Sequence, residues 1–216
     1  MLLIDPFHNI YLGTTKRFMK YIISQYNDIL SNTQSQQSIE TFCGNFDNGG
    51  PTGIRLPSKI VTEYKRFTGY EWRLFLHFLS SVAFWQLHVQ PNHLRVWQLF
   101  VDAIDILARP ILRLSDIELA HQHLIEFAVQ SEKECGAQFS SPNIHLHLHL
   151  REIIQDYGPI YGWWGWGFER MNGFLNHVTN NHRQFSSQIL QRIQILIRSN
   201  TITQMVYNIV LFYFLC

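Results

Sequence analysis

The sequence predicts a mainly α-helical fold, and three observations lead to that prediction. Apolar residues recur at helical spacing in several long segments, and Gly or Pro closes some of them. Alternating patterns typical of strands are few, and the best one covers residues 144–150. Hydrophobic residues make up 46% of the chain and aromatic residues 14%, which argues for a packed core and against disorder.

The first part of the chain is expected to hold one helix and one loop. Residues 1–30 form an entry segment with an amphipathic helix, whose apolar face is spaced at helical intervals over Phe18, Ile22, Tyr26 and Leu30. Residues 31–55 are rich in Ser, Gln, Asn and Gly. That composition predicts a polar loop or linker.

A helical domain is expected over residues 56–141. Its helices should cover residues 69–89, 92–108 and 114–136. The polar breaks between these helices are short, which favours neighbours that run antiparallel, as in a bundle.

The last of these three helices has the clearest end signals. Ser115 and Glu118 have the spacing of a capping box, in which each residue's side chain bonds the other's backbone N–H. Gly136 is placed to end the helix, because glycine tolerates the backbone conformation that closes many helices.

The remaining residues divide into a histidine-rich region and a tail. Residues 142–198 hold the histidines and a final predicted helix at 186–199, and residues 199–216 form an apolar tail. The apolar run that starts at Met205 has 12 residues and contains Asn208. A membrane span needs roughly 20 apolar residues. We therefore expect no membrane association, and the tail favours a buried closing segment or a sequence that ends abnormally.

Charge and cysteine usage limit the class of protein. Seventeen Lys and Arg against 16 Asp and Glu argue against nucleic-acid binding through bulk positive charge, although "TKRFMK", "EYKRF" and "NHRQ" offer local contacts. Cys43, Cys135 and Cys216 form no CxxC pair and no disulfide framework, which suits an intracellular protein. The first residues have no basic region typical of a signal peptide, and no nuclear import signal is visible.

Three histidines in alternate positions, His145, His147 and His149, form the most conspicuous motif. A strand would place all three on one face, whereas a helix would place His145 beside His149 and turn His147 away. Either arrangement offers two or three ligands for zinc, but structural zinc sites usually have four ligands, often thiolates. Polar histidines on a half-buried element are the more frequent reading of such a pattern.

Two further features allow a structural and a functional reading. Glu169 stands next to Arg170, and such a pair is more often a surface ion pair than a catalytic site. The stretch "YGWWGWGF" offers aromatic faces on which bases can stack, but clustered tryptophans more often fill a core.

Taken in order, several segments resemble the C-terminal half of the CACTA-type (En/Spm-like) DNA transposases, and the fungal type most. These segments are "LIDPFHNIYLGTTKRFMK", "RLPSKI", "LRVWQLFVDAIDIL" and "SPNIHLHLHLREIIQDYGPIYGWWGWGFERMNGFL". The resemblance covers roughly residues 1–185 and is most specific from Pro142 to Gly173.

The resemblance implies a fold and a reaction. Members of this family have an RNase H-like core whose three acids hold two Mg²⁺ ions for DNA cleavage and strand transfer, and a helical insertion separates the second acid from the third. A CxxC and a histidine pair hold a structural zinc ion. By motif, Glu169 takes the third-acid position, and His145 and His149 take the zinc positions, with His147 as a substitute ligand.

The resemblance also implies DNA, in the form of transposon ends, as the partner, and the nucleus as the location. Arg170, Lys16 and Arg17 are weak candidates for DNA contacts. Asp5 and His8 are expected to form a structural motif at the entry to the insertion, because the family places its second acid before the CxxC.

This sequence departs from the family pattern in one major respect. The first two acids, the core strands that carry them and the CxxC all belong upstream of residue 1. We therefore expect a truncated or degenerate transposase fragment, inactive alone, that binds neither Mg²⁺ nor Zn²⁺ stoichiometrically and whose missing half or partner chain would have to complete the site. The alternative is a helical module retained for binding protein or DNA without catalysis.

Overall fold

The computed structural model describes residues 4–30, 32–47, 56–167 and 194. The chain divides into two compact units, Met1–Gly165 and Trp166–Cys216, and most of the second lies outside these described residues. The described residues are mainly helical and include no strand, which confirms the predicted helical class. Nearly all of the predicted helix at 186–199 and the tail lie outside the described residues.

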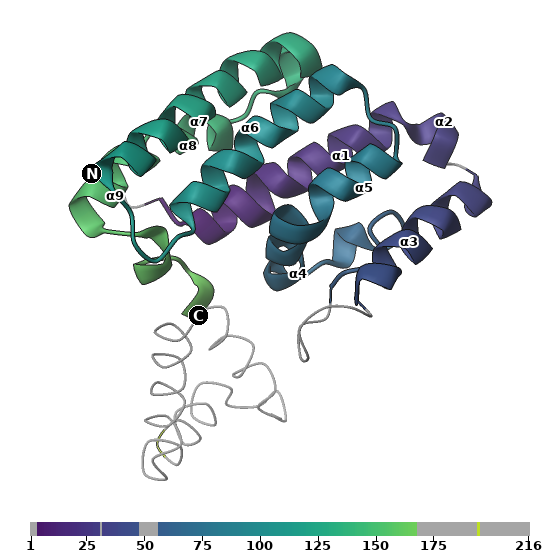
Figure 1. Cartoon of the computed structure of the whole chain (residues 1–216), viewed down its shortest axis with the longest axis horizontal. Helices are drawn as coiled ribbons and strands as arrows, with labels where there is room; N and C mark the ends of the chain where they lie inside the picture. The colour runs from purple at the N-terminus through teal and green to yellow at the C-terminus, as the bar shows by residue number, and fades with distance from the viewer. Residues whose placement is uncertain (1–3, 31, 48–55, 168–193, 195–216) are drawn as a thin grey trace, which may run out of the picture. The chain divides into compact units, whose positions relative to one another are not determined.

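The first unit begins with a helix that runs through its centre. The wide π-helical segment η1, Phe7–Thr15, continues directly into α1, Lys16–Gln25, and a short α2, Asn27–Leu30, follows. The predicted spacing is confirmed at its buried positions, which are Phe18, Ile22 and Leu30. In Figure 1, α1 runs alongside α6, and the ring of Phe18 contacts that of Trp97.

The prediction of a loop over residues 31–55 is wrong for much of that segment, because α3 covers Thr33–Asp47. The Asn32 side-chain oxygen accepts the Gln34 N–H at 2.8 Å, which satisfies one of the free donors at the start of the helix. Ile39 and Cys43, four residues apart, are both buried. Ile39 and Cys43 therefore give α3 a buried face within a segment of polar composition.

The predicted helix at 69–89 is a continuous helical run with a wide turn in the middle. It consists of α4, Gly69–Leu74, the π-helical η3, Phe75–Leu79, and α5, Ser80–Gln86. It follows the short 3₁₀ turn η2, Tyr64–Arg66.

The longest helices are α6, Pro91–Leu107, and α7, Leu114–Cys135, which lie side by side (Figure 1). α7 begins at Leu114 as predicted, but the predicted capping box of Ser115 and Glu118 is wrong, because Arg113 is the N-cap residue and Ser115 lies within the first turn. The side chain of Asp116, in the first turn, accepts the Arg113 N–H at 3.0 Å, and Glu118 instead pairs with Arg151 at 3.2 Å.

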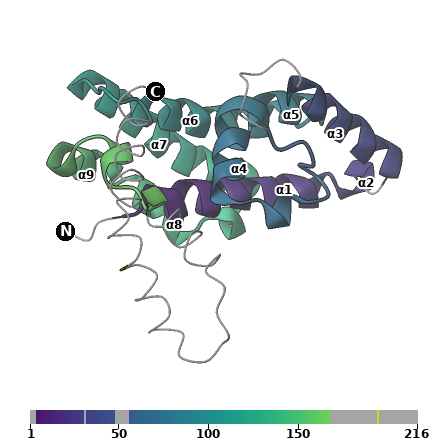
Figure 2. The ribbon, with the colours of Figure 1, turned by 90° about the horizontal axis from the view of Figure 1, so that it is seen from below.

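The prediction that Gly136 ends α7 is confirmed, since it caps the helix with φ +85°. After the 3₁₀ turn η4, Ala137–Phe139, the chain forms α8, Pro142–His147, and α9, Leu150–Tyr157, and then the turn η5, Ile160–Gly162. Figures 1 and 2 both place α8 and α9 at the end of the cluster opposite α3.

Contacts between buried aromatic rings hold the helices together. Phe18 of α1 lies 4.6 Å from Trp97 of α6 between ring centroids, and Phe100 of α6 lies 4.9 Å from Phe127 of α7. All four side chains are buried. Each such pair contributes about 0.5–1.5 kcal/mol beyond the burial of its area.

Neither Cys43 nor Cys135 forms a disulfide, and burial raises the pKa of each thiol to about 11. Such thiols are poor nucleophiles at neutral pH. Among the described helices, none is long and apolar enough to cross a membrane.

His88 should carry a measurable backbone strain. It has φ +52°, and the Val89 N–H donates to the Phe84 carbonyl at 3.1 Å in a helix-ending motif that favours glycine. We expect His88→Gly to raise the free energy of unfolding by about 0.5–1 kcal/mol in urea denaturation. The control His88→Ala also loses the imidazole but keeps the Cβ, so an equal gain for both variants would contradict the strain.

Candidate functional site

Three motifs meet at one end of the first unit, and the first of them is far from the other two in the sequence. They are the Asp-Pro-Phe-His-Asn opening, the histidine segment of α8, and the Trp-Gly segment that follows α9. Hydrogen bonds join the first motif to each of the other two. The candidate site is therefore this junction.

The carboxylate of Asp5 ties the start of the unit to its end. Its Oδ1 accepts the N–H of Phe7 at 3.0 Å and the N–H of Gly165 at 2.8 Å, while its Oδ2 lies 2.5 Å from His8 Nδ1. A Cβ at residue 165 would lie 2.5 Å from Asp5 Oδ2, so this close approach requires glycine.

The wide helix η1 packs against α8. The side-chain amide of Asn9 donates to the Asn143 carbonyl at 3.2 Å, and the Thr14 hydroxyl lies 3.3 Å from His147 Nε2. A Cβ at Gly13 would lie 2.2 Å from the Asn143 side-chain nitrogen, so the Asn143 side chain occupies the space that any larger residue at position 13 would need.

The histidine segment adopts the helical alternative. α8 starts after Ser141 with Pro142 in its first turn, a favourable position for proline. His145 and His149 are exposed, and their Nε2 atoms lie 3.3 Å apart. His147 points the other way, into the core.

The pair His145 and His149 fits half of a zinc site. Zn–N bonds of about 2.0–2.1 Å at a tetrahedral angle place two ligand nitrogens roughly 3.3–3.4 Å apart, which matches the observed separation. Within the described residues, however, no group of three or more His, Cys, Asp or Glu is arranged to hold a metal ion. These two histidines would therefore hold zinc only with further ligands.

His147 acts as a core residue. Its side chain is completely buried, with ring centroids 5.3 Å from Phe100 and 6.4 Å from Phe127. Burial lowers the pKa of its imidazole from 6.5 to about 3, so the ring is neutral at physiological pH. Its distance from solvent separates it from the exposed pair, and it does not join them as a third ligand.

The Trp-Gly segment is packed at two of its tryptophans. Trp164 is 8% exposed, and the guanidinium of Arg73 lies 5.1 Å from the centre of its ring. The Trp163 indole N–H donates to the Gly158 carbonyl at 2.9 Å. This arrangement favours the packing interpretation of the tryptophans over base stacking.

The remaining predicted site residues fall into two groups. Glu169 and Arg170 lie outside the described residues. Lys16 and Arg17 begin α1, and the Arg17 guanidinium donates to the backbone carbonyls of the η4 turn and its neighbour, namely Gln138, Phe139 and Ser140. Arg17 thus has a structural task at the junction between α7 and α8, and its contact with DNA stays a prediction.

A polar network beside this junction was not predicted from the sequence. The Tyr11 hydroxyl of η1 lies 3.1 Å from His77 Nε2 of η3, and His77 Nδ1 is hydrogen-bonded to Asp105. Burial raises the pKa of Tyr11 to about 12, so the phenol stays protonated. A histidine inside an otherwise apolar helical run was the only signal in the sequence.

Comparison of the chain with protein-family models, curated proteins and solved structures finds no match. The assignment of a function therefore depends on the motifs and on the geometry of this junction.

Replacing Asp5 should loosen the junction. Asp5→Ala removes the acceptor for two backbone N–H groups, and we expect it to lower the free energy of unfolding by about 1–3 kcal/mol in urea denaturation. Asp5→Asn keeps one side-chain oxygen and should cost less. Equal stability of Asp5→Ala and the wild type would contradict this role.

Replacing His147 should change how stability depends on pH. The folded-state pKa of about 3 lies below the ordinary 6.5, so the unfolded chain binds a proton first, and stability is lost as pH falls from 6.5 towards 3. The slope from this residue is on the order of 1.4 kcal/mol per pH unit. We expect His147→Gln to remove it.

The comparison is made by urea denaturation between pH 4 and 8. The control His88→Asn removes an exposed histidine at a position whose backbone asparagine tolerates. A slope that is the same in His147→Gln as in the wild type would refute the buried neutral histidine.

Proposed function

We propose that this chain carries the helical insertion and the third-acid segment of a CACTA-type (En/Spm-like) transposase, a family that performs cut-and-paste DNA transposition. The observation that carries the proposal is the Asp5–Gly165 hydrogen bond, because it joins two of the motifs on which the resemblance rests. The third motif, in α8, is held to the same opening segment through Asn9.

The position of the two ends of the unit supports its role as an insertion. A domain inserted into another fold must leave and re-enter that fold at neighbouring points, and such insertions occur where chain ends lie close together. Asp5 and Gly165 are in direct contact at 2.8 Å although 160 residues separate them. The helices between these two residues bury an aromatic core of their own, so the unit can pack without a strand from the proposed RNase H-like core.

The exposed histidine pair supports the same assignment. In the proposed transposase, His145 and His149 would supply two ligands of a structural zinc ion, and a CxxC would supply the others. Their ring nitrogens have the separation that two zinc ligands need. Zinc would tie the insertion to the remainder of the enzyme, because its ligands would come from both.

The number of acids argues against catalysis by these 216 residues alone. The reaction uses two divalent ions held about 4 Å apart, and Mg²⁺ requires several oxygen ligands in near-octahedral geometry. Glu169 can offer at most two oxygens. By motif, no other residue of this chain takes an acid position of the family.

The DNA that precedes the codon for residue 1 tests the assignment. An in-frame CxxC preceded by an aspartate would support it, and would supply both missing zinc ligands and at least one missing acid. A long, expressed upstream frame with neither feature would overturn it, and would favour the alternative of a helical interaction module.

A DNA-cleavage assay that compares the wild type with Glu169→Ala gives a second test. We expect residues 1–216 to show no nicking of DNA in Mg²⁺ or Mn²⁺, and no difference between the wild type and Glu169→Ala, because the acids act as a unit. If the upstream frame supplies the other acids, the joined chain should cleave, and Glu169→Ala should reduce its rate by several orders of magnitude. Cleavage by residues 1–216 that disappears in Glu169→Ala would contradict the count of acids.

A further inference from the structure

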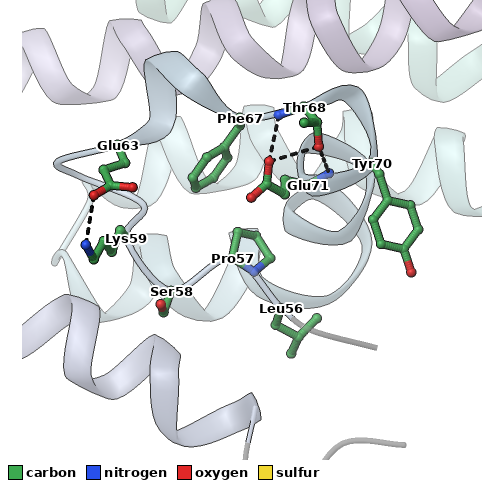
Figure 3. Close-up of a pocket in the computed structure, with 9 residues that line it drawn as sticks. All are labelled: Leu56, Pro57, Ser58, Lys59, Glu63, Phe67, Thr68, Tyr70 and Glu71. Atoms are coloured by element: carbon green, nitrogen blue, oxygen red, sulfur yellow. Dashed lines mark hydrogen bonds and ion pairs between the residues drawn. The ribbon is translucent and has the colours of Figure 1, made fainter. Parts of the chain in front are cut away.

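A cavity of about 590 Å³ lies between the 56–63 segment and the start of α4 (Figure 3). Its size is in the range of small-molecule and side-chain binding sites. Its lining combines apolar and charged side chains, among them Pro57, Lys59, Glu63, Phe67, Tyr70 and Glu71.

The apolar and aromatic part of the lining comes from Leu56, Pro57, Phe67 and Tyr70, and Phe67 is 9% exposed. Figure 3 shows the ring of Phe67 between the side chains of Glu63 and Glu71. Trp72 supports this ring from the core, with ring centroids 5.3 Å apart, and Trp72 itself is completely buried. The ring is therefore held in place before any ligand arrives.

The carboxylate of Glu71 is fixed by a capping box at the start of α4. Its Oε2 accepts the Thr68 N–H at 2.7 Å and the Thr68 hydroxyl at 2.9 Å, and the Thr68 hydroxyl in turn accepts the Glu71 N–H. Within the described part of the chain, no hydrogen bond to its Oε1 is present, so this oxygen can accept one from a ligand.

The carboxylate of Glu63 is held from the other side. Its Oε1 accepts a hydrogen bond from Lys59 Nζ at 2.8 Å, and that bond lowers the pKa of Glu63, so the group stays charged at neutral pH. Its Oε2 has no hydrogen-bond partner among the described residues. The Lys59 side chain is 60% exposed, which leaves it free to move aside when another cation enters.

We propose that this cavity binds the guanidinium of an arginine side chain presented by a peptide segment of a protein partner. A guanidinium is flat and stacks on an aromatic face, and its donors point outward in the plane towards acceptors at its edges. A flat ring with a carboxylate on either side matches that shape and charge. An ammonium group would act as a point charge and would use this arrangement less completely.

The same lining excludes a phosphate as the ligand. The two carboxylates that face the cavity would repel the anion, and the single lysine in the lining is already paired with Glu63. The proposal is therefore independent of DNA binding and of the proposed transposase function, and either can fail without the other.

Titration of the 216-residue chain with N-acetyl-arginine methylamide tests the proposal, with amide resonances observed by NMR. We expect saturable shifts at Thr68 and Glu71 with a Kd on the order of 1 mM, as for a single side chain in a shallow site. The neutral analogue N-acetyl-citrulline methylamide should produce none, and N-acetyl-lysine methylamide should bind several-fold more weakly.

Two variants and one control complete the test. Glu71→Gln keeps the capping box, which accepts either residue, and Glu63→Gln lies outside it; each should weaken binding roughly tenfold through loss of a charged acceptor. Glu132→Gln makes the same charge change on the exposed face of α7 and should leave binding unaltered. The proposal is overturned if arginine gives no saturable shift, if citrulline or lysine binds as well as arginine, or if the Glu132 variant weakens binding as much as the others.

Discussion

The fold of the described unit depends on one carboxylate. Asp5 accepts the N–H groups of Phe7 and Gly165 and contacts His8, so a single side chain sets the start of the first helix and the position of the last segment. The helices between these two points form one unit whose first and last segments are in contact. A short acceptor at residue 5 and a residue without Cβ at 165 are both required, which explains why these residue types stand at the two ends of the unit.

The interior of this helical unit combines contacts between tilted aromatic rings with isolated polar groups. Phe18, Trp97, Phe100 and Phe127 supply the contacts between helices, and His147 lies among the last two as a neutral ring. One side-chain contact, with Thr14, orients the imidazole. A buried polar group with few partners lowers the stability of the fold but restricts how its helix can be oriented. His147 therefore favours one rotation of α8 about its axis.

The helical class and the pairing of His145 with His149 could be predicted from the sequence, because periodicity and i,i+4 spacing are local properties. Three things could not. The cap of α7 was misassigned, because its N-cap residue is Arg113 rather than a Ser or Thr, and Asp116 rather than Glu118 accepts the N-cap N–H. α3 was hidden by its polar composition. The contact of Asp5 with Gly165 depends on a chain separation that no local pattern records. The alternation of Leu and His was misleading too, since Ile144, His147 and Leu150 form the buried stripe at a spacing of three.

The wide helical segments η1 and η3 have a consequence for how such a sequence can change over time. Each places more residues in a turn than an α-helix does, and each contributes one member of the Tyr11–His77 contact. Loss of one codon within η1 would convert a wide turn into ordinary α-helix, and later side chains such as Phe18 would stay close to their present orientation, because the wide turn accommodates the extra residue. Loss of one codon within α1 has no such outlet, and it would turn the side chains on one side of the deletion by about 100° around the helix axis. The wide segments are therefore the places along this helix where a change in chain length is tolerated.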